Sequence, residues 1–199
     1  MENKKGISKS VISISIVIVS LVIGIIVGAF YINGKQSVAV VEENLAGGEI
    51  SLTYSDEENL FSIENALPTS DMVGMKYDSA ELFFDFTIKT EIEDANSISY
   101  DVILVKDDIT STSLEENIKV YLEREINGSY VKVIDPVIFK ANITDKELGE
   151  SVMKIYTHTK TKSGNDNYRL RMWVSDTASY NVGEIQNFGI KVAVKGSAK

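Results

Sequence analysis

Apolar and polar residues alternate with a period of two along most of the chain beyond residue 48, which is typical of half-buried β-strands. The clearest case places Tyr168, Leu170, Met172 and Val174 on one side of a strand. Eight segments show the pattern: 49–54, 81–88, 97–104, 117–122, 130–133, 151–159, 168–174 and 188–194. Short alternating strands separated by turns predict an all-β fold, an antiparallel β-sandwich of Ig-like or jelly-roll-like type.

Turn signals lie between these segments. Asn127-Gly128 predicts a tight hairpin just before the strand at 130–133. Pro68 and Pro136 are expected in connections, because proline has no N–H to donate to a sheet. Ser113 with Glu116 matches a capping box and predicts one helical turn.

A different pattern fills residues 11–32, where the chain carries no charge and 15 of the 22 residues are Ile, Val, Leu or Phe. About 20 such residues span a bilayer as an α-helix. Lys4, Lys5 and Lys9 precede this segment, so the positive-inside rule predicts a cytoplasmic N-terminus. The sequence therefore predicts a cytoplasmic start (1–10), a transmembrane helix in the lipid bilayer (11–32), a tether (33–48) and an extracellular domain (49–196).

Two kinds of processing are alternatives to a permanent anchor. Lys4-Lys5-Gly6-Ile7 resembles the site at which type IV pilin-like precursors are cut, after Gly6, so that the mature chain begins at Ile7. Bacterial pilins have an acid at the fifth mature residue, and this sequence has Val11 there. Cleavage as a signal peptide near residues 37–39 is the other alternative, although the apolar run is longer than usual for one.

Charge and residue usage narrow the function. The net charge of −9 disfavours nucleic-acid binding, and the absence of cysteine excludes disulfides and thiol chemistry. His158 is the sole histidine, which excludes a two-histidine zinc helix, and its polar surroundings predict a surface position. Carboxylates cluster at 56–58, 91–94 and 107–108, so a carboxylate-based hydrolase is a further alternative, but no catalytic motif supports it. We expect no enzyme activity, no cofactor and no metal.

Arg169, Arg171 and Trp173 form the most informative cluster, because the chain has three arginines and two of them lie here. Alternation places these side chains opposite the apolar side of the strand at 168–174. Arg and Trp are enriched at binding hot spots, so the three residues are a candidate interaction face. The alternative is that they pair with the domain's own acids across the sheet.

Three stretches resemble known proteins: Leu67-Pro68-Thr69-Ser70-Asp71 with Gly74, the strand 168–173, and the strand 188–192. Their order is similar to that in uncharacterised membrane-anchored surface proteins of Gram-positive-type bacteria, and more distantly to the camelysin and TasA family of β-sandwich biofilm proteins. The first resemblance implies a fold and a cell-surface location. The second implies fibre formation by an N-terminus freed by cleavage, which the anchor here does not match.

Together these observations predict a single-pass membrane protein with a non-catalytic role in adhesion, matrix or envelope structure. Its partner would be a surface protein or a polysaccharide. Asn127-Gly128-Ser129 and Asn142-Ile143-Thr144 also match the N-glycosylation acceptor pattern.

Overall fold

A computed structural model of the chain describes residues 40–54, 60–64, 67–78, 83–107, 117–146, 148–178 and 187–199. The predicted span at 11–32, the processing site at Gly6 and Ile7, and the helical turn at 113–116 lie outside these residues. Among the residues that are described, no helix has both the length and the apolarity needed to cross a bilayer.

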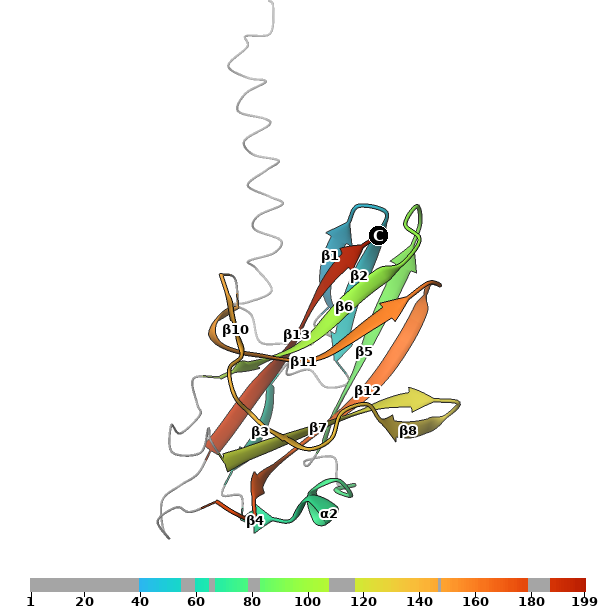
Figure 1. The fold of residues 1–199 in the computed structure, drawn as a ribbon. Helices are drawn as coiled ribbons and strands as arrows, with labels where there is room; N and C mark the ends of the chain where they lie inside the picture. The colour runs from blue at the N-terminus through green and yellow to red at the C-terminus, as the bar shows by residue number, and fades with distance from the viewer. Residues whose placement is uncertain are drawn as a thin grey trace, which may run out of the picture. The chain divides into compact units, whose positions relative to one another are not determined.

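The described strands form two sheets (Figure 1). One contains β1 (Val40–Leu45), β2 (Gly48–Tyr54), β4 (Pro68–Thr69), β5 (Phe83–Ile92), β7 (Ile118–Ile126), β8 (Ser129–Lys132), β9 (Val137–Ile138) and β12 (Gly164–Ser175). The other contains β3 (Leu60–Glu64), β6 (Ile98–Lys106), β10 (Ile143–Asp145), β11 (Gly149–Lys160) and β13 (Asn187–Ala198).

The eight-stranded sheet has the order β1-β2-β5-β12-β7-β8, with β4 paired to β12 and β9 to β7. The five-stranded sheet has the order β10-β11-β6-β13-β3. Every pairing among the described strands is antiparallel except that of β4 with β12. The prediction of a mostly antiparallel β-fold is therefore confirmed.

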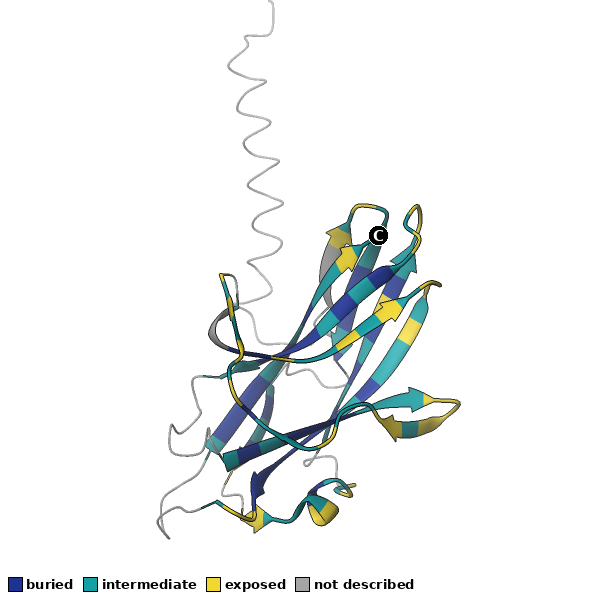
Figure 2. Ribbon diagram, in the orientation of Figure 1, coloured by how far each residue is buried: buried dark blue, intermediate teal, exposed yellow. Residues whose placement is uncertain are grey.

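Burial alternates along several strands as the sequence predicted, most regularly along β5 (Figure 2). Tyr168, Leu170, Met172 and Val174 of β12 are each 0% exposed and belong to the core between the sheets. The other sheet contributes the buried side of β6, namely Ile98, Tyr100, Val102 and Leu104. Fully burying a large apolar side chain contributes about 1.5–3 kcal/mol, so this alternation is the main source of stability.

Hydrogen bonds of buried tyrosines join the sheets through the core. The Tyr54 hydroxyl of β2 donates to the carbonyl oxygen of Val192 in β13 at 2.6 Å, and burial raises the pKa of Tyr54 to about 12. The hydroxyls of Tyr100 in β6 and Tyr168 in β12 are 2.7 Å apart. These bonds give buried hydroxyl groups the partners that buried polar atoms require.

The predicted hairpin at Asn127-Gly128 is confirmed. It joins β7 to β8, and Asn127 and Gly128 have φ angles of 52° and 79°. Two consecutive positive φ angles are characteristic of the type I′ turn, which favours the Asn-Gly pair.

The prediction of a tether across 33–48 is wrong for Val40–Leu45, which form β1 and pair with β2. The sequence VVEENL does not alternate, so it lacks the signal that marked the other strands. Its strand geometry comes from backbone pairing with β2 across a turn at Gly47, where φ is 97°. The sheet therefore begins by residue 40.

Five short elements of the described chain gave no sequence signal: β3, β4, β9, β10 and the helix α2 (Asp71–Gly74). Pro68, expected in a connection, instead begins β4, where the first position of a two-residue strand tolerates the missing N–H. α2 follows directly and has four residues, too few to show a helical period.

α2 packs against the outer side of β12. Asp71 accepts a bond from Lys119 Nζ of β7 at 2.7 Å, and Gly74 is buried against the Trp173 indole. A Cβ at residue 74 would overlap the indole ring, so only glycine allows the helix to lie this close. Trp173 is 2% exposed as a result.

We expect Gly74→Ala to cost about 1–3 kcal/mol of unfolding free energy, because the added methyl overpacks the indole. Trp173 is the sole tryptophan, so its fluorescence reports this contact directly. Emission should shift to longer wavelength in Gly74→Ala as the ring gains contact with water. Val73→Ala, at an exposed position of the same helix, is the matched control and should change neither property. Unchanged stability and emission in Gly74→Ala would show that α2 does not lie on Trp173.

Candidate functional site

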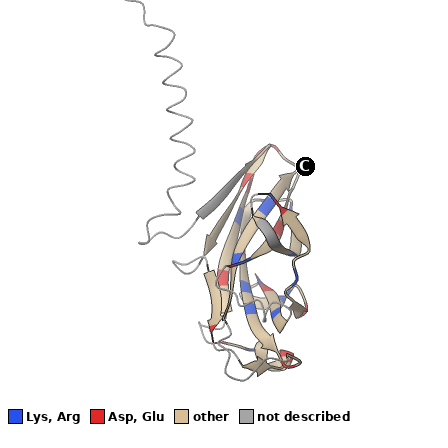
Figure 3. Ribbon diagram, turned by 90° about the vertical axis from the view of Figure 1, so that its left-hand side faces the viewer, with Lys and Arg blue, Asp and Glu red and all other residues tan. Residues whose placement is uncertain are grey.

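The candidate interaction face lies on the side of β5, β7 and β12 that points away from the core, called here the outer face. Register places Asp85, Arg169 and Glu123 in one row across these three strands. A neighbouring row joins Thr87, Asn167 and Glu125 through hydrogen bonds of 2.8 Å and 2.7 Å. Charges of both signs are interspersed over the domain (Figure 3). The outer face is thus a set of cross-strand polar pairs.

Arg169 is held on three sides. Its Nε and Nη2 donate to the two carboxylate oxygens of Asp85 at 2.7 Å and 2.6 Å. The guanidinium carbon lies 3.8 Å from the Phe83 ring centroid and 4.2 Å from that of Tyr130. Hydrogen bonding to Asp85 raises the pKa of Arg169. The side chain is still 21% exposed, so a rigid cation flanked by two aromatic rings is accessible at the surface.

Arg171 lies two residues further along β12 and is buried, at 7% exposure. It forms an ion pair with Glu123, and its Nε donates to the carbonyl oxygen of Tyr77 at 2.7 Å. Burial lowers the pKa of Arg171. Its donors are therefore directed to groups within the domain.

The predicted interaction face is consequently correct in orientation but wrong in accessibility for two of its three residues. Arg169, Arg171 and Trp173 share the outer side of β12, yet Arg171 and Trp173 are covered. Alternation fixes which side of a strand a residue occupies and carries no information about what packs on that side. The alternative, pairing with the domain's own acids, is confirmed for both arginines.

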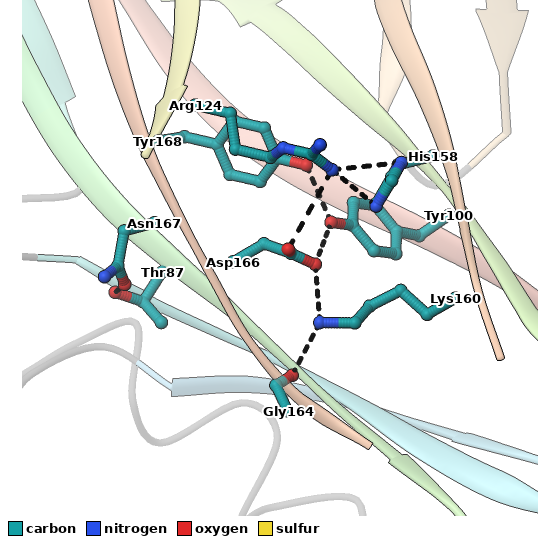
Figure 4. Close-up of polar contacts among 9 residues, drawn as sticks. All are labelled: Thr87, Tyr100, Arg124, His158, Lys160, Gly164, Asp166, Asn167 and Tyr168. Carbon is teal, nitrogen blue, oxygen red and sulfur yellow. Dashed lines mark hydrogen bonds and ion pairs between the residues drawn. The ribbon is translucent and has the colours of Figure 1, made fainter. Parts of the chain in front are cut away.

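A second polar cluster lies between the two sheets, called here the inter-sheet cluster (Figure 4). It consists of Tyr100, Arg124, His158, Lys160, Asp166 and Tyr168. Asp166 accepts a hydrogen bond from the Tyr100 hydroxyl at 2.7 Å. It also forms an ion pair with Lys160, whose Nζ lies 2.8 Å from the carboxylate. Burial raises the pKa of Tyr100 and of Tyr168, so both phenols stay neutral.

The polar neighbours of His158 in the sequence predicted a surface position, but the side chain does not lie on an open surface. It is partly buried, stacks on Tyr156 with ring centroids 6.0 Å apart, and meets Tyr100 edge-on at 5.6 Å. Arg124 Nη1 lies 2.5 Å from its Nε2 and 3.2 Å from its Nδ1. A guanidinium can only donate, so the ring must be neutral to accept this bond.

The predicted carboxylate clusters fall partly outside the described residues, namely 56–58 and Asp108. Of the others, Glu91 pairs with Lys89, and Asp107 pairs with Lys191 at 2.6 Å. Glu93 and Asp94 are exposed in the turn after β5. Within the described part of the chain, no three His, Cys, Asp or Glu residues are grouped so that they could hold a metal ion.

Acid should weaken the domain through His158. Burial lowers its pKa, the nearby Arg124 lowers it further, Lys160 acts in the same direction and Asp166 opposes them. The unfolded state, with an ordinary pKa of about 6.5, then binds more protons than the folded state. This contribution to stability is complete above about pH 6.5 and is lost as the pH falls through the lowered value.

The free energy of unfolding should therefore fall more steeply between pH 7 and pH 5 in the wild type than in His158→Gln. Glutamine can accept a bond from Arg124 without titrating. Denaturant unfolding across this range measures the difference between the two proteins. Parallel pH profiles would contradict the assigned state of His158.

No protein-family model matches the chain, and no curated protein sequence matches it either. The resemblance to membrane-anchored surface proteins and to the camelysin and TasA family stays a prediction. Within the described residues, the geometry supports a mostly antiparallel two-sheet domain with an accessible cation–aromatic site at Arg169 and a cluster that ties the sheets together.

Proposed function

We propose that the chain is a single-pass membrane protein with an extracellular β-sandwich and a non-catalytic role in adhesion, matrix or envelope structure. The uncharged apolar run at 11–32 and the lysines before it support the anchor and its orientation. The domain would meet a surface protein or a polysaccharide through the accessible part of the outer face.

The observation that carries this proposal is the arrangement around Arg169. Its guanidinium lies between Phe83 and Tyr130 and is fixed by Asp85, so little side-chain freedom is left to lose on binding. Preorganised aromatic and arginine side chains supply much of the free energy of protein contacts. Neither residue of the Arg169–Asp85 pair is fully buried, at 21% and 25% exposure, so a partner can reach them.

The use of the other charged groups supports a structural role over a chemical one. Asp166, Glu123 and Asp145 each form an ion pair, with Lys160, Arg171 and Lys195 respectively. Each pair joins two different strands, and the Lys160–Asp166 pair joins the two sheets, so these carboxylates help to hold the domain together. His158 likewise contacts Arg124 across the two sheets.

Arg169→Ala and Tyr130→Ala should both reduce cell adhesion and aggregation when they replace the wild-type chain in its host. Tyr130→Ala leaves the Arg169–Asp85 ion pair in place. It therefore separates the loss of the aromatic contact surface from the loss of the ion pair. Losing one partly exposed ion pair and its ring contacts costs about 1–2 kcal/mol, which a domain of this size withstands.

Lys154→Ala is the matched control, because it removes a partly exposed cation paired with Asp101 on the five-stranded sheet. It should leave adhesion unchanged. Wild-type adhesion by both outer-face variants, at normal surface abundance, would rule out this face as the contact.

The pilin-like alternative requires a mature chain that begins at Ile7. A helix continuing through 33–48 would have favoured it, but Val40–Leu45 form strand β1. N-terminal sequencing distinguishes the two, since the anchored protein retains residues 1–6 and the pilin does not.

A further inference from the structure

The structure separates the two N-glycosylation acceptor patterns by what their asparagine side chains do. We infer that Asn127 is an N-glycan acceptor on this domain and that Asn142 is not. This inference rests on the proposed extracellular location, because N-linked glycans are added to exported chains. The donor is a lipid-linked oligosaccharide phosphate.

The reaction requires a free amide nitrogen. The Nδ2 atom forms a bond to the anomeric carbon of the donor sugar, and the bond from that carbon to the phosphate oxygen breaks. The lipid phosphate leaves with the bonding pair, and Nδ2 loses one proton. No oxidation or reduction takes place, so the acceptor needs only an accessible Asn and the hydroxyl of the Ser or Thr two residues later.

Asn127 meets this requirement at the tip of the β7–β8 hairpin. Asn127, Gly128 and Ser129 are all exposed, and no hydrogen bond to the Asn127 side chain is present in the described residues. The space beside Gly128 is open, with nothing within 4 Å of where its Cβ would be. A transferase and a sugar can therefore approach the amide without opening the sheet.

Asn142 is also exposed, but its amide is already in use. Its Nδ2 donates to the carbonyl oxygen of Lys154 at 3.0 Å, and its Oδ1 accepts from the N–H of Lys154 at 2.8 Å. A two-point contact with one residue uses the Nδ2 hydrogen on the same side as Oδ1. In a trans amide the substituent on nitrogen takes that side, so a sugar would replace this hydrogen and break the link to β11.

The surroundings of Asn127 also suit a glycan. Ile126 and Val131 are among the few large apolar side chains exposed in the described residues, at 40% and 45%, and they flank this turn. The register pairs Ile126 with Ser129 and Val131 with Arg124. The side chains of Ile126 and Val131 therefore lie on the same side of the hairpin as the Ser129 hydroxyl. A sugar on Asn127 would screen this apolar surface from other proteins.

The test is intact mass and peptide mapping of the full-length protein isolated from the membranes of its native host. We expect added carbohydrate mass on the peptide that contains Asn127, complete loss of that mass in Ser129→Ala, and no loss in Thr144→Ala. Ser129→Ala keeps the Asn127-Gly128 turn, so folding is preserved. An unmodified mass, carbohydrate on Asn142, or carbohydrate that survives Ser129→Ala would overturn the inference.

The same cells show whether location or modification has failed. The chain has no cysteine, so Lys162→Cys, in the exposed β11–β12 turn, and Ser8→Cys, before the predicted span, are single labelling sites. A membrane-impermeant maleimide should label intact cells through Lys162→Cys and not through Ser8→Cys. If this labelling pattern is found and the protein carries no carbohydrate, the inference about the glycan is wrong and the proposed orientation stands. Labelling through Ser8→Cys only would overturn the proposed orientation and, with it, the glycan.

Discussion

Strand β12 must satisfy two different surroundings with one alternating sequence, and the rest of the domain depends on this constraint. It is paired on both edges, with β5 and β7. One of its sides places Tyr168, Leu170, Met172 and Val174 entirely in the core. A slip of one residue in its pairing would exchange that side with Arg169, Arg171 and Trp173, which no apolar core could accept. The register of the central strands is therefore fixed by burial.

On the opposite side of β12, two residues are shielded from solvent although no second sheet of the described chain packs there. Arg171 is covered because Glu123 and the Tyr77 carbonyl satisfy it, and Trp173 is covered because Gly74 brings α2 within contact distance. Arg169 lies beyond this cover and keeps part of its surface. A single strand thus passes from a closed to an accessible environment within five residues.

The inter-sheet cluster pairs polar groups on the inner side of the sheets, as the contacts of Arg171 do on the outer side. Strands from both sheets supply its members, and the Tyr100–Tyr168 bond joins the sheets directly. Among the described residues, most polar groups of the cluster are paired within it, and Arg124 Nε is the exception, buried without a hydrogen-bond partner.

Long alternating strands could be predicted from the sequence because one side of each is buried, as in β6 and β12. β1 could not, since its VVEENL sequence lacks alternation and its geometry depends on a partner strand. α2 and β4 could not either, because elements of two to four residues are set by tertiary contact. Candidate residues on β12 were placed on the correct side, but their burial depended on segments distant in sequence. The same holds for His158, whose neighbours across the sheets no local pattern reveals.

Site-specific photo-crosslinking on intact cells tests most directly whether the outer face contacts a partner. A benzophenone amino acid would replace Tyr130 on the outer face or, as the comparison, Thr157, which is exposed on the five-stranded sheet. A contact surface centred on Arg169 predicts covalent capture of an envelope protein or polysaccharide from position 130 and none from position 157. Capture from position 157 alone, or from neither position, would contradict a contact surface centred on Arg169.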